Sequence, residues 1–351
     1  MNVFVTVLLT VLMFGLLIFI HEFGHFITAK LFKVKVNEFA LGMGPKILGF
    51  GKGETKYSLR LFPIGGFVSM EGEEEDSDDP RSFKKQKVWK RIIICSAGVF
   101  MNFVLGILIA IGLVASTNSD MLTSVTVAGI VSEKDAGGLQ SGDKILSVSG
   151  YKIFVGEDIS FGVSRSDPTG KTELIELETE FVVLRSGEKI TLEKVKPFAR
   201  VKYEDGTEED RYSFYVKGEE KNFFSVLKHG FFEAISYIRT TVLGLMDLIT
   251  GRVGIEGLGG VIKVGQVVGE VAKYGVSNFL NLVALISVNL GVMNLLPIPA
   301  LDGGRILLLA VEGIIRKPLN QKLEYVLISV SMFLLFALMI FVAIKDIVSF
   351  F

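Results

Sequence analysis

Apolar and polar residues are distributed very unevenly along this chain. Four long runs carry no charged side chain and consist mainly of apolar residues, at positions 4–20, 92–115, 276–301 and 325–344. Each run comes near or exceeds the roughly 20 residues that an α-helix needs to cross the hydrocarbon core of a bilayer. The pattern therefore predicts an α-helical membrane protein with four transmembrane helices.

The segment between the first two runs has a different pattern. Apolar and polar residues alternate there, for example at Tyr57, Leu59 and Leu61, and Gly65 and Gly66 follow as turn residues. Alternation broken by Gly and Pro is typical of β-hairpins. We expect a membrane-associated β-hairpin or small sheet, followed by a solvated acidic loop over residues 71–79, to which no chemistry is assigned.

The long segment between the second and third runs divides into two parts. Short β-branched runs at 124–131, 144–150, 181–185 and 189–195, separated by Gly, Asp and Ser, predict a small β-rich domain over 116–205. Apolar residues spaced three and four apart over 223–250 predict an amphipathic helix. We divide the chain into an N-terminal membrane half (1–115), this domain (116–205), a linker and membrane-surface segment (206–275) and a C-terminal membrane half (276–351).

Composition and charge support a membrane protein and indicate its orientation. Half of the 351 residues are apolar, and the single cysteine, Cys95, excludes an intramolecular disulfide. Lys and Arg gather between the first and second runs and between the third and fourth. Because cytoplasmic loops carry such an excess, both loops are expected in the cytoplasm, with both termini and the segment 116–275 outside.

The first run leads directly into the sequence His21-Glu22-Phe23-Gly24-His25. Two histidines four residues apart lie on one face of a helix, so both can bind one metal ion, and the intervening glutamate can act as a base. The alternative is a polar cluster at a helix end that reaches the membrane surface. That alternative is disfavoured because unpaired polar groups beside a membrane span cost several kcal/mol.

A catalytic zinc site requires a third protein ligand and an open position for water. The other histidine, His229, is interpreted as an interfacial residue. Asp302, in the sequence "NLLPIPALDGGR", is the only acidic residue that borders the third run. Pro297, Pro299 and two glycines surround it, and irregular backbone at membrane depth is tolerated where it lines a cavity. The alternative for Asp302 is a helix N-cap.

Three motifs together resemble the site-two protease family of intramembrane zinc metalloproteases, in its bacterial RseP type. They are the HExxH sequence, "SAGVFMNF" in the second run and "SVNLGVMNLLPIPALDGGR" in the third. The resemblance implies zinc ligands at His21, His25 and Asp302, with Glu22 as general base. Asn102 in the second motif is assigned to helix packing ahead of any role in the cleft.

The family resemblance also implies residues that contact the substrate. Asn294, Pro297 and Pro299 match positions that shape the cleft, and Gly65, Gly66 and Phe67 match a hairpin loop beside the site. An edge strand there would capture an unwound substrate by strand addition. A plain hairpin turn is the alternative for the glycine pair.

The sequence "DAGGLQSGDKILSVSG" resembles part of a PDZ domain, so the β-rich domain is expected to be a single extracytoplasmic PDZ domain. Gly138, Leu139, Gly142 and Asp143 form its expected peptide-binding region. Such a domain either binds exposed C-terminal peptides or acts as a size filter over the cleft. Both interpretations remain open.

The leading hypothesis is therefore a multi-pass zinc endopeptidase of the bacterial cytoplasmic membrane. It would hydrolyse peptide bonds in or near transmembrane segments of single-span membrane proteins. The family resemblance implies anti-sigma factors and remnant signal peptides as substrates, in regulated intramembrane proteolysis. Its expected partners are these substrates and the lipid bilayer, with no nucleic acid; the oligomeric state is open. The alternative is a non-catalytic membrane scaffold with a PDZ domain. A transporter is disfavoured because no internal repeats are seen.

Overall fold

The computed structural model describes residues 2–51, 53–73, 75–167, 172–203, 206–254 and 259–348. The chain forms two compact units, which are described separately. We call residues 1–109 and 258–351 the membrane unit, and residues 110–257 the β-rich unit. Helix α2 passes from the first unit into the second.

Four helices of the described chain are long and apolar enough to cross a membrane, which confirms the four predicted spans. They are α1 (Val3–Leu31), α2 (Val88–Ser116), α6 (Val276–Asn294) and α8 (Gln321–Val348). Helix α1 continues well past the end of its charge-free run, so the HExxH sequence lies within the helix. The chain is therefore built as a multi-pass membrane protein.

The third span is shorter than its apolar run. Helix α6 ends at Asn294, whereas the charge-free run continues to residue 301. Pro297 and Pro299 explain the difference, because proline has no N–H for the helix and disfavours helical backbone in the residue before it. A new helix, α7 (Asp302–Ile315), begins directly after this break.

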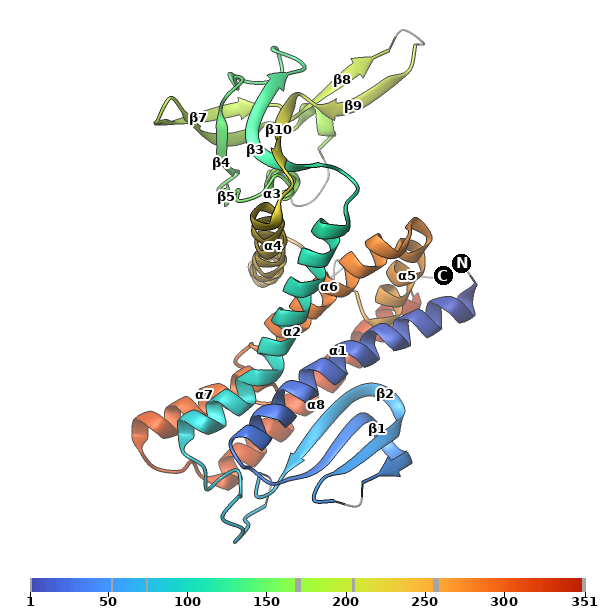
Figure 1. Cartoon of the computed structure of the whole chain (residues 1–351), viewed down its shortest axis with the longest axis vertical. Coiled ribbons are helices and arrows are strands. Elements are labelled where there is room, and N and C mark those ends of the chain that lie inside the picture. The colour runs from blue at the N-terminus through green and yellow to red at the C-terminus, as the bar shows by residue number, and fades with distance from the viewer. Residues whose placement is uncertain are drawn as a thin grey trace. The chain divides into compact units, whose positions relative to one another are not determined.

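Apolar side chains pack the helices of the membrane unit together. Met13 and Leu17 of α1 are buried against Val283 of α6 and Val268 of α5 (Val261–Val271). Asp346 near the end of α8 accepts hydrogen bonds from the backbone N–H groups of Gly260 and Lys263, and so caps the start of α5. The start of α1 and the end of α8 consequently lie at the same end of the unit (Figure 1).

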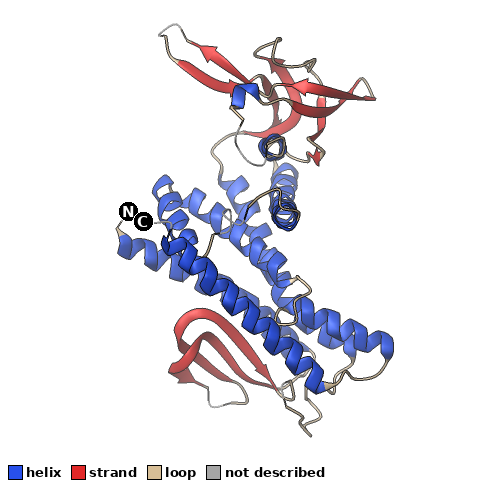
Figure 2. Ribbon diagram, turned by 180° about the vertical axis from the view of Figure 1, so that it is seen from behind, coloured by secondary structure: helices blue, strands red, loops and turns tan. Residues whose placement is uncertain are grey.

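A small sheet of two long strands lies beside α1 in the membrane unit (Figure 2). Strand β1 (Val36–Phe50) pairs with β2 (Lys56–Met70), and Leu41 faces both Leu59 and Gly66 of β2. The chain must therefore reverse direction between these two residues. Gly65, with φ of +75°, lies in this reversal, as the turn pattern predicted.

The β-rich unit contains one main sheet in the strand order β10-β3-β4-β6-β7, with β5 paired to β4 and a separate β8–β9 hairpin. The strands are β3 (Met121–Ile130), β4 (Lys144–Val148), β5 (Tyr151–Lys152), β6 (Thr179–Arg185), β7 (Glu188–Val195), β8 (Phe198–Lys202), β9 (Glu208–Tyr212) and β10 (Phe214–Glu220). The four predicted β-branched runs coincide with β3, β4, β6 and β7. Strand β10 joins this sheet from beyond residue 205, because pairing with β3 completes the hydrogen bonds of that strand.

Two helices accompany this sheet. Helix α3 (Asp158–Ser164) contributes Ile159 and Val163 to the buried core around Phe181. Helix α4 (Phe223–Ile249) matches the predicted amphipathic helix, and Asn222 caps it by accepting hydrogen bonds from the backbone N–H groups of Phe224 and Ser225. The unit is β-rich as expected, while its assignment as a PDZ domain, its boundaries and its extracytoplasmic location stay predictions.

Candidate metal centre

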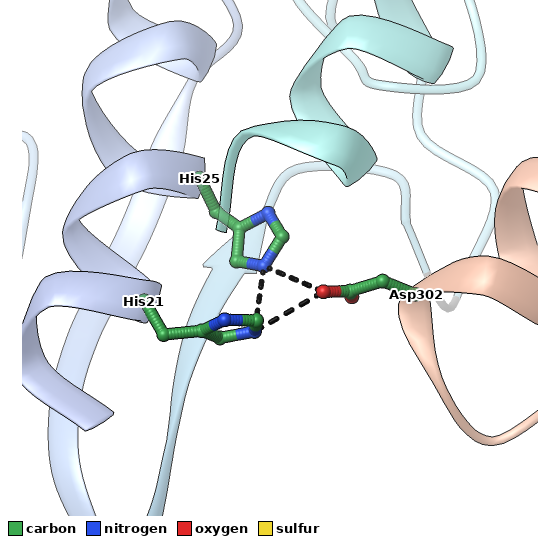
Figure 3. Close-up of side chains that lie close together, drawn as sticks. All are labelled: His21, His25 and Asp302. Atoms are coloured by element: carbon green, nitrogen blue, oxygen red, sulfur yellow. Dashed lines mark hydrogen bonds and ion pairs between the residues drawn. The ribbon is translucent and has the colours of Figure 1, made fainter. Parts of the chain in front are cut away.

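The two histidines of the HExxH sequence lie on successive turns of α1 and point the same way (Figure 3). Their Nε2 atoms are 3.3 Å apart. This is the arrangement expected when two imidazoles are spaced four residues apart on one helix. The structure thus brings two candidate metal-binding atoms together on α1.

The Asp302 carboxylate reaches the same point from α7. Its Oδ2 lies 3.1 Å from Nε2 of His21 and 3.4 Å from Nε2 of His25. Leu301, not Asp302, occupies the N-cap position of α7, and no side chain makes a capping hydrogen bond there. The carboxylate therefore faces the histidines in place of the helix-capping role considered from the sequence.

The break between α6 and α7 is what gives Asp302 this position. A Cβ on Gly303 would lie 2.2 Å from the backbone oxygen of Leu295, and one on Gly304 would lie 2.1 Å from that of Ile298. Only glycine permits such close approach of the backbone to the preceding turn. The Asp-Gly-Gly sequence thus folds tightly onto the end of α6 and leaves the Asp302 side chain directed at α1.

The three side chains fit a metal ion by the chemistry of their donor atoms. One atom from each of His21, His25 and Asp302 lies within 4.8 Å of the others. Oδ2 of Asp302 is buried and, among the described residues, is paired with no group other than the two imidazoles, as expected of an atom placed to bind a cation. Two imidazoles and one carboxylate are a typical ligand set for catalytic zinc, which keeps a further position open for water.

Helix α2 supports both imidazoles from behind. Nδ1 of His25 is 2.8 Å from the backbone oxygen of Ile94, and Nδ1 of His21 is 3.3 Å from Nδ2 of Asn102. Gly98 lies between these contacts, and a Cβ there would be 2.4 Å from Nε2 of His25. The sequence reasoning missed this supporting role, although the motif "SAGVFMNF" supplied the signal.

A cavity of about 690 Å³ opens onto these side chains. Glu22 lines it, beside the two histidines and Asp302. Residues Phe67–Met70 of β2 form another part of its wall, and a Cβ on Gly66 would lie 2.9 Å from Cγ of Glu22. The end of β2 therefore runs beside the candidate base, and the cavity provides room for an extended peptide.

The acidic loop also contributes to this cavity. Glu71, Gly72, Glu73, Glu75, Asp76 and Ser77 line it. Glu73 forms an ion pair with Arg305 of α7, three residues after Asp302. Hydrogen bonds from Ser77, Lys35 and Asn37 lower the pKa of Glu71 to about 2. The sequence reasoning assigned no chemistry to this loop, because loop composition does not reveal which cavity it borders.

The structure places some of the residues predicted to contact the substrate at the cavity or the candidate metal centre, and others away from the cavity. Phe67 lines the cavity and Gly66 adjoins Glu22, while Nδ2 of Asn294 lies 3.5 Å from Nε2 of His21. Pro297 and Pro299 lie in the link between α6 and α7 and do not line this cavity in the described residues. Their evident effect is to end α6 and so to position Asp302.

The four residues of the predicted peptide-binding region lie in one loop of the β-rich unit. Gly138 and Gly142 have positive φ values, of +92° and +96°, and Leu139 is buried in the core. Asp143 is fully buried, which opposes ionisation, but two hydrogen bonds of 2.7 Å from Arg185 hold its pKa below the usual range. Leu139 and Asp143 therefore stabilise the loop from within, and peptide binding there stays a prediction.

Comparison with known proteins identifies the family. The sequence model that defines peptidase family M50 matches residues 9–338 of this chain. The chain belongs to peptidase family M50. It is 32% identical to the zinc metalloprotease RasP of Bacillus licheniformis, in a match covering 97% of this chain and 98% of the relative.

Two further relatives agree with this membership. The chain is 37% identical to a Clostridium perfringens protein that carries the name of a zinc metalloprotease, over 97% of this chain and 98% of the relative. It is 30% identical to the regulator of sigma-W protease RasP of Bacillus subtilis, with the same two shares covered. This M50 peptidase is a zinc metalloprotease, as the motifs indicated.

Proposed function

We propose that this zinc metalloprotease hydrolyses peptide bonds within or near transmembrane segments of single-span membrane proteins. The observation that carries the proposal is the meeting of His21, His25 and Asp302 at one point, from helices α1 and α7, in a unit built of membrane-spanning helices. A site with these donors, opening into a cavity beside a β-strand, suits cleavage of a peptide that enters from the bilayer.

In this proposal His21, His25 and Asp302 hold the zinc ion and Glu22 is the general base. Zinc held there would lower the pKa of a water ligand to about 7 and would polarise the substrate carbonyl. Glu22 removes a proton from the attacking water and delivers it to the departing amine nitrogen. The Glu22 side chain lines the same cavity as both histidines.

The strand wall of the cavity suggests how a helical substrate is held. A helix hides its carbonyl groups in its own hydrogen bonds, so the bond to be cleaved must first be extended. Among the described strands, the segment Gly66–Met70 pairs with β1 on one side only, which leaves its other edge open for strand addition. Gly65, Gly66 and Phe67 are the proposed contacts at this edge, and Asn294, beside His21, is a further proposed contact.

The proposed substrates are anti-sigma-factor-like membrane proteins and remnant signal peptides in regulated intramembrane proteolysis. The name of the Bacillus subtilis relative, a regulator of sigma-W protease, supports the first class. The β-rich unit is the proposed PDZ domain, which would bind exposed C-terminal peptides or limit the size of substrates that reach the cleft. The proposed location is the bacterial cytoplasmic membrane.

The proposed topology places both termini and the β-rich unit outside the cytoplasm. Lys and Arg between the first two spans and between the last two support it. Single cysteines introduced at positions 85 and 218 would test it in whole cells, since Cys95 is buried and stays silent. An impermeant thiol reagent is expected to label position 218 alone. Labelling of position 85 alone would show that the orientation is the opposite of the one proposed.

Glu22→Gln provides the main test of the mechanism. The purified variant is expected to bind zinc like the wild type but to cleave a model transmembrane substrate about 10²–10⁴-fold more slowly, because it lacks the base. His21→Ala is the matched control, and it is expected to lose both zinc and cleavage. Equal cleavage by Glu22→Gln and wild type would contradict the proposed mechanism.

A further inference from the structure

Asn102 lies on α2 behind the candidate metal centre and is almost fully buried, with 1% of its surface exposed. Its backbone oxygen accepts a hydrogen bond of 2.8 Å from Oγ of Ser287 on α6. Its side chain instead reaches His21 on α1. The contact between α2 and α6 expected from the sequence is thus made by the Asn102 backbone. The side-chain amide takes no part in that contact.

The imidazole of His25 shows what a metal-binding histidine requires. A neutral imidazole carries its proton on one nitrogen and can bind a metal only through the other. Nδ1 of His25 donates to the backbone oxygen of Ile94 at 2.8 Å, and a carbonyl oxygen can only accept. This contact keeps the proton on Nδ1, so Nε2 of His25 is free to bind a metal ion.

His21 needs an equivalent acceptor at its own Nδ1. Nε2 of His21 faces Asp302, so the proton must again lie on Nδ1 when a metal is bound. The group beside this Nδ1 is the Asn102 amide, whose Nδ2 is at 3.3 Å. The Oδ1 atom of Asn102 is buried and has no hydrogen-bond partner in the part of the chain that the structure describes. The acceptor atom of the Asn102 side chain is therefore idle in the arrangement observed.

A half-turn of the amide about the Cβ–Cγ bond exchanges its oxygen and nitrogen, which have nearly the same shape. We propose that Asn102 is a positioning residue for zinc binding, with its Oδ1 accepting a hydrogen bond from Nδ1–H of His21 in the zinc-loaded protein. The amide thereby selects the His21 tautomer whose Nε2 binds the ion. This inference rests on the zinc ligands proposed above.

Zinc affinity of the full-length protein in detergent tests this role directly. Each protein is stripped of metal and titrated with zinc against a chromophoric chelator. Asn102→Leu removes the acceptor at nearly constant volume and is expected to weaken zinc binding by about 10–100-fold, the usual effect of losing such a supporting group. Asn102→Asp retains an acceptor oxygen, so it is expected to bind zinc at least as tightly as the wild type.

Two controls separate this role from packing and from the ligand assignment. Ser287→Ala removes the hydrogen bond to the Asn102 backbone and leaves the imidazole untouched, so its zinc affinity should equal that of the wild type. His21→Ala should lose high-affinity zinc binding. If His21→Ala binds zinc like the wild type, the proposed ligand set fails, whatever the Asn102 variants do.

The outcomes for the Asn102 variants decide the inference itself. Wild-type zinc affinity in Asn102→Leu overturns it, and so does an equal loss in Asn102→Leu and Asn102→Asp, which would indicate packing alone. If Asn102→Leu does not fold, Asn102→Asp decides, because weak zinc binding by that folded variant overturns the inference. ¹⁵N NMR of the three histidines should also show a protonated, slowly exchanging Nδ1 at His21 only when residue 102 supplies an acceptor.

Discussion

At the scale of single residues, glycines determine how closely α1 and α2 approach. A Cβ on Gly24 would lie 2.3 Å from the backbone oxygen of Ala97, and the histidines on either side of Gly24 reach α2 at Ile94 and Asn102. A side chain at Gly24 would therefore push the two helices apart. The positions of the candidate metal-binding atoms depend on this contact between the helices as well as on the histidines themselves.

Gly24→Ala is expected to destabilise the protein by about 1–3 kcal/mol, the usual cost of adding atoms to a well-packed contact with no room to relax. The same change should weaken zinc binding, because α2 supports both imidazoles. Thermal unfolding in detergent and zinc titration measure the two effects. Gly15→Ala on the same helix is the control, since nothing lies within 4 Å of a Cβ there. Equal behaviour of the two variants would refute this account.

At the scale of helices and strands, the position of the site depends more on breaks within these elements than on their regular parts. Pro297 and Pro299 end α6 and let α7 begin at Asp302, and the reversal of β2 at Gly65 brings its last residues beside Glu22. An ion pair between Arg91 of α2 and Glu312 then links α2 to α7. The apolar pattern predicted the helices, but these interruptions position the site.

Helix α4 is linked to the sheet of the β-rich unit through His229, which the sequence reasoning interpreted as an interfacial residue. The imidazole is buried, with Nε2 at 3.2 Å from Glu219 of β10 and Nδ1 at 3.8 Å from Glu157. The nearby Glu157 carboxylate, followed by the hydrogen bond to Glu219, raises the pKa of His229 despite its burial. The protonated form therefore stabilises the folded state.

Because the folded pKa of His229 is raised, its stabilising effect is full below the unfolded pKa of about 6.5 and is lost as the pH rises through the folded pKa. His229→Gln should consequently lower stability more at pH 6 than at pH 9. Hydrogen exchange of α4 and β10 amides in the full chain measures this. Lys228→Gln removes the other cation that pairs with Glu219, and its effect on stability should not differ between pH 6 and pH 9. A constant difference across this pH range would contradict the prediction.

At the scale of the whole molecule, the chain combines two units with different sources of stability. The β-rich unit has an apolar core of its own, centred on Phe181, Val183 and Ile145. The membrane unit joins helices from both ends of the chain, and the proposed zinc ligands link α1 to α7 across nearly 280 residues of sequence. Metal binding should therefore stabilise the membrane unit selectively.

Removal of zinc with a chelator is expected to abolish cleavage and to lower the unfolding temperature of the membrane unit. A ligand at 1,000 times its Kd stabilises the folded state by about 4 kcal/mol, which the metal-free protein would lose. Hydrogen exchange, read separately for α1, α7 and the main β-sheet, locates the effect. Added zinc should restore both properties. Cleavage that persists after metal analysis shows complete removal would disprove the zinc requirement.

The sequence by itself determined the four spans, the β-rich unit and the motif residues, because hydrophobic run length, alternation and ligand spacing are local properties of the chain. HExxH places two imidazoles on one helix face whatever surrounds it. The third donor could be inferred from an acidic residue beside a broken span, but only the folded chain brings Asp302 within 3.4 Å of both histidines.

Tertiary structure alone decided what supports and surrounds the site. The Ile94 carbonyl, the Asn102 amide and the acidic loop reach the centre through contacts between distant segments, and no local pattern specifies such contacts. The same holds for His229, whose sequence neighbours suggested an interface while its carboxylate partners come from other elements. The sequence specifies which chemical groups are present, and tertiary packing determines which of them come into contact.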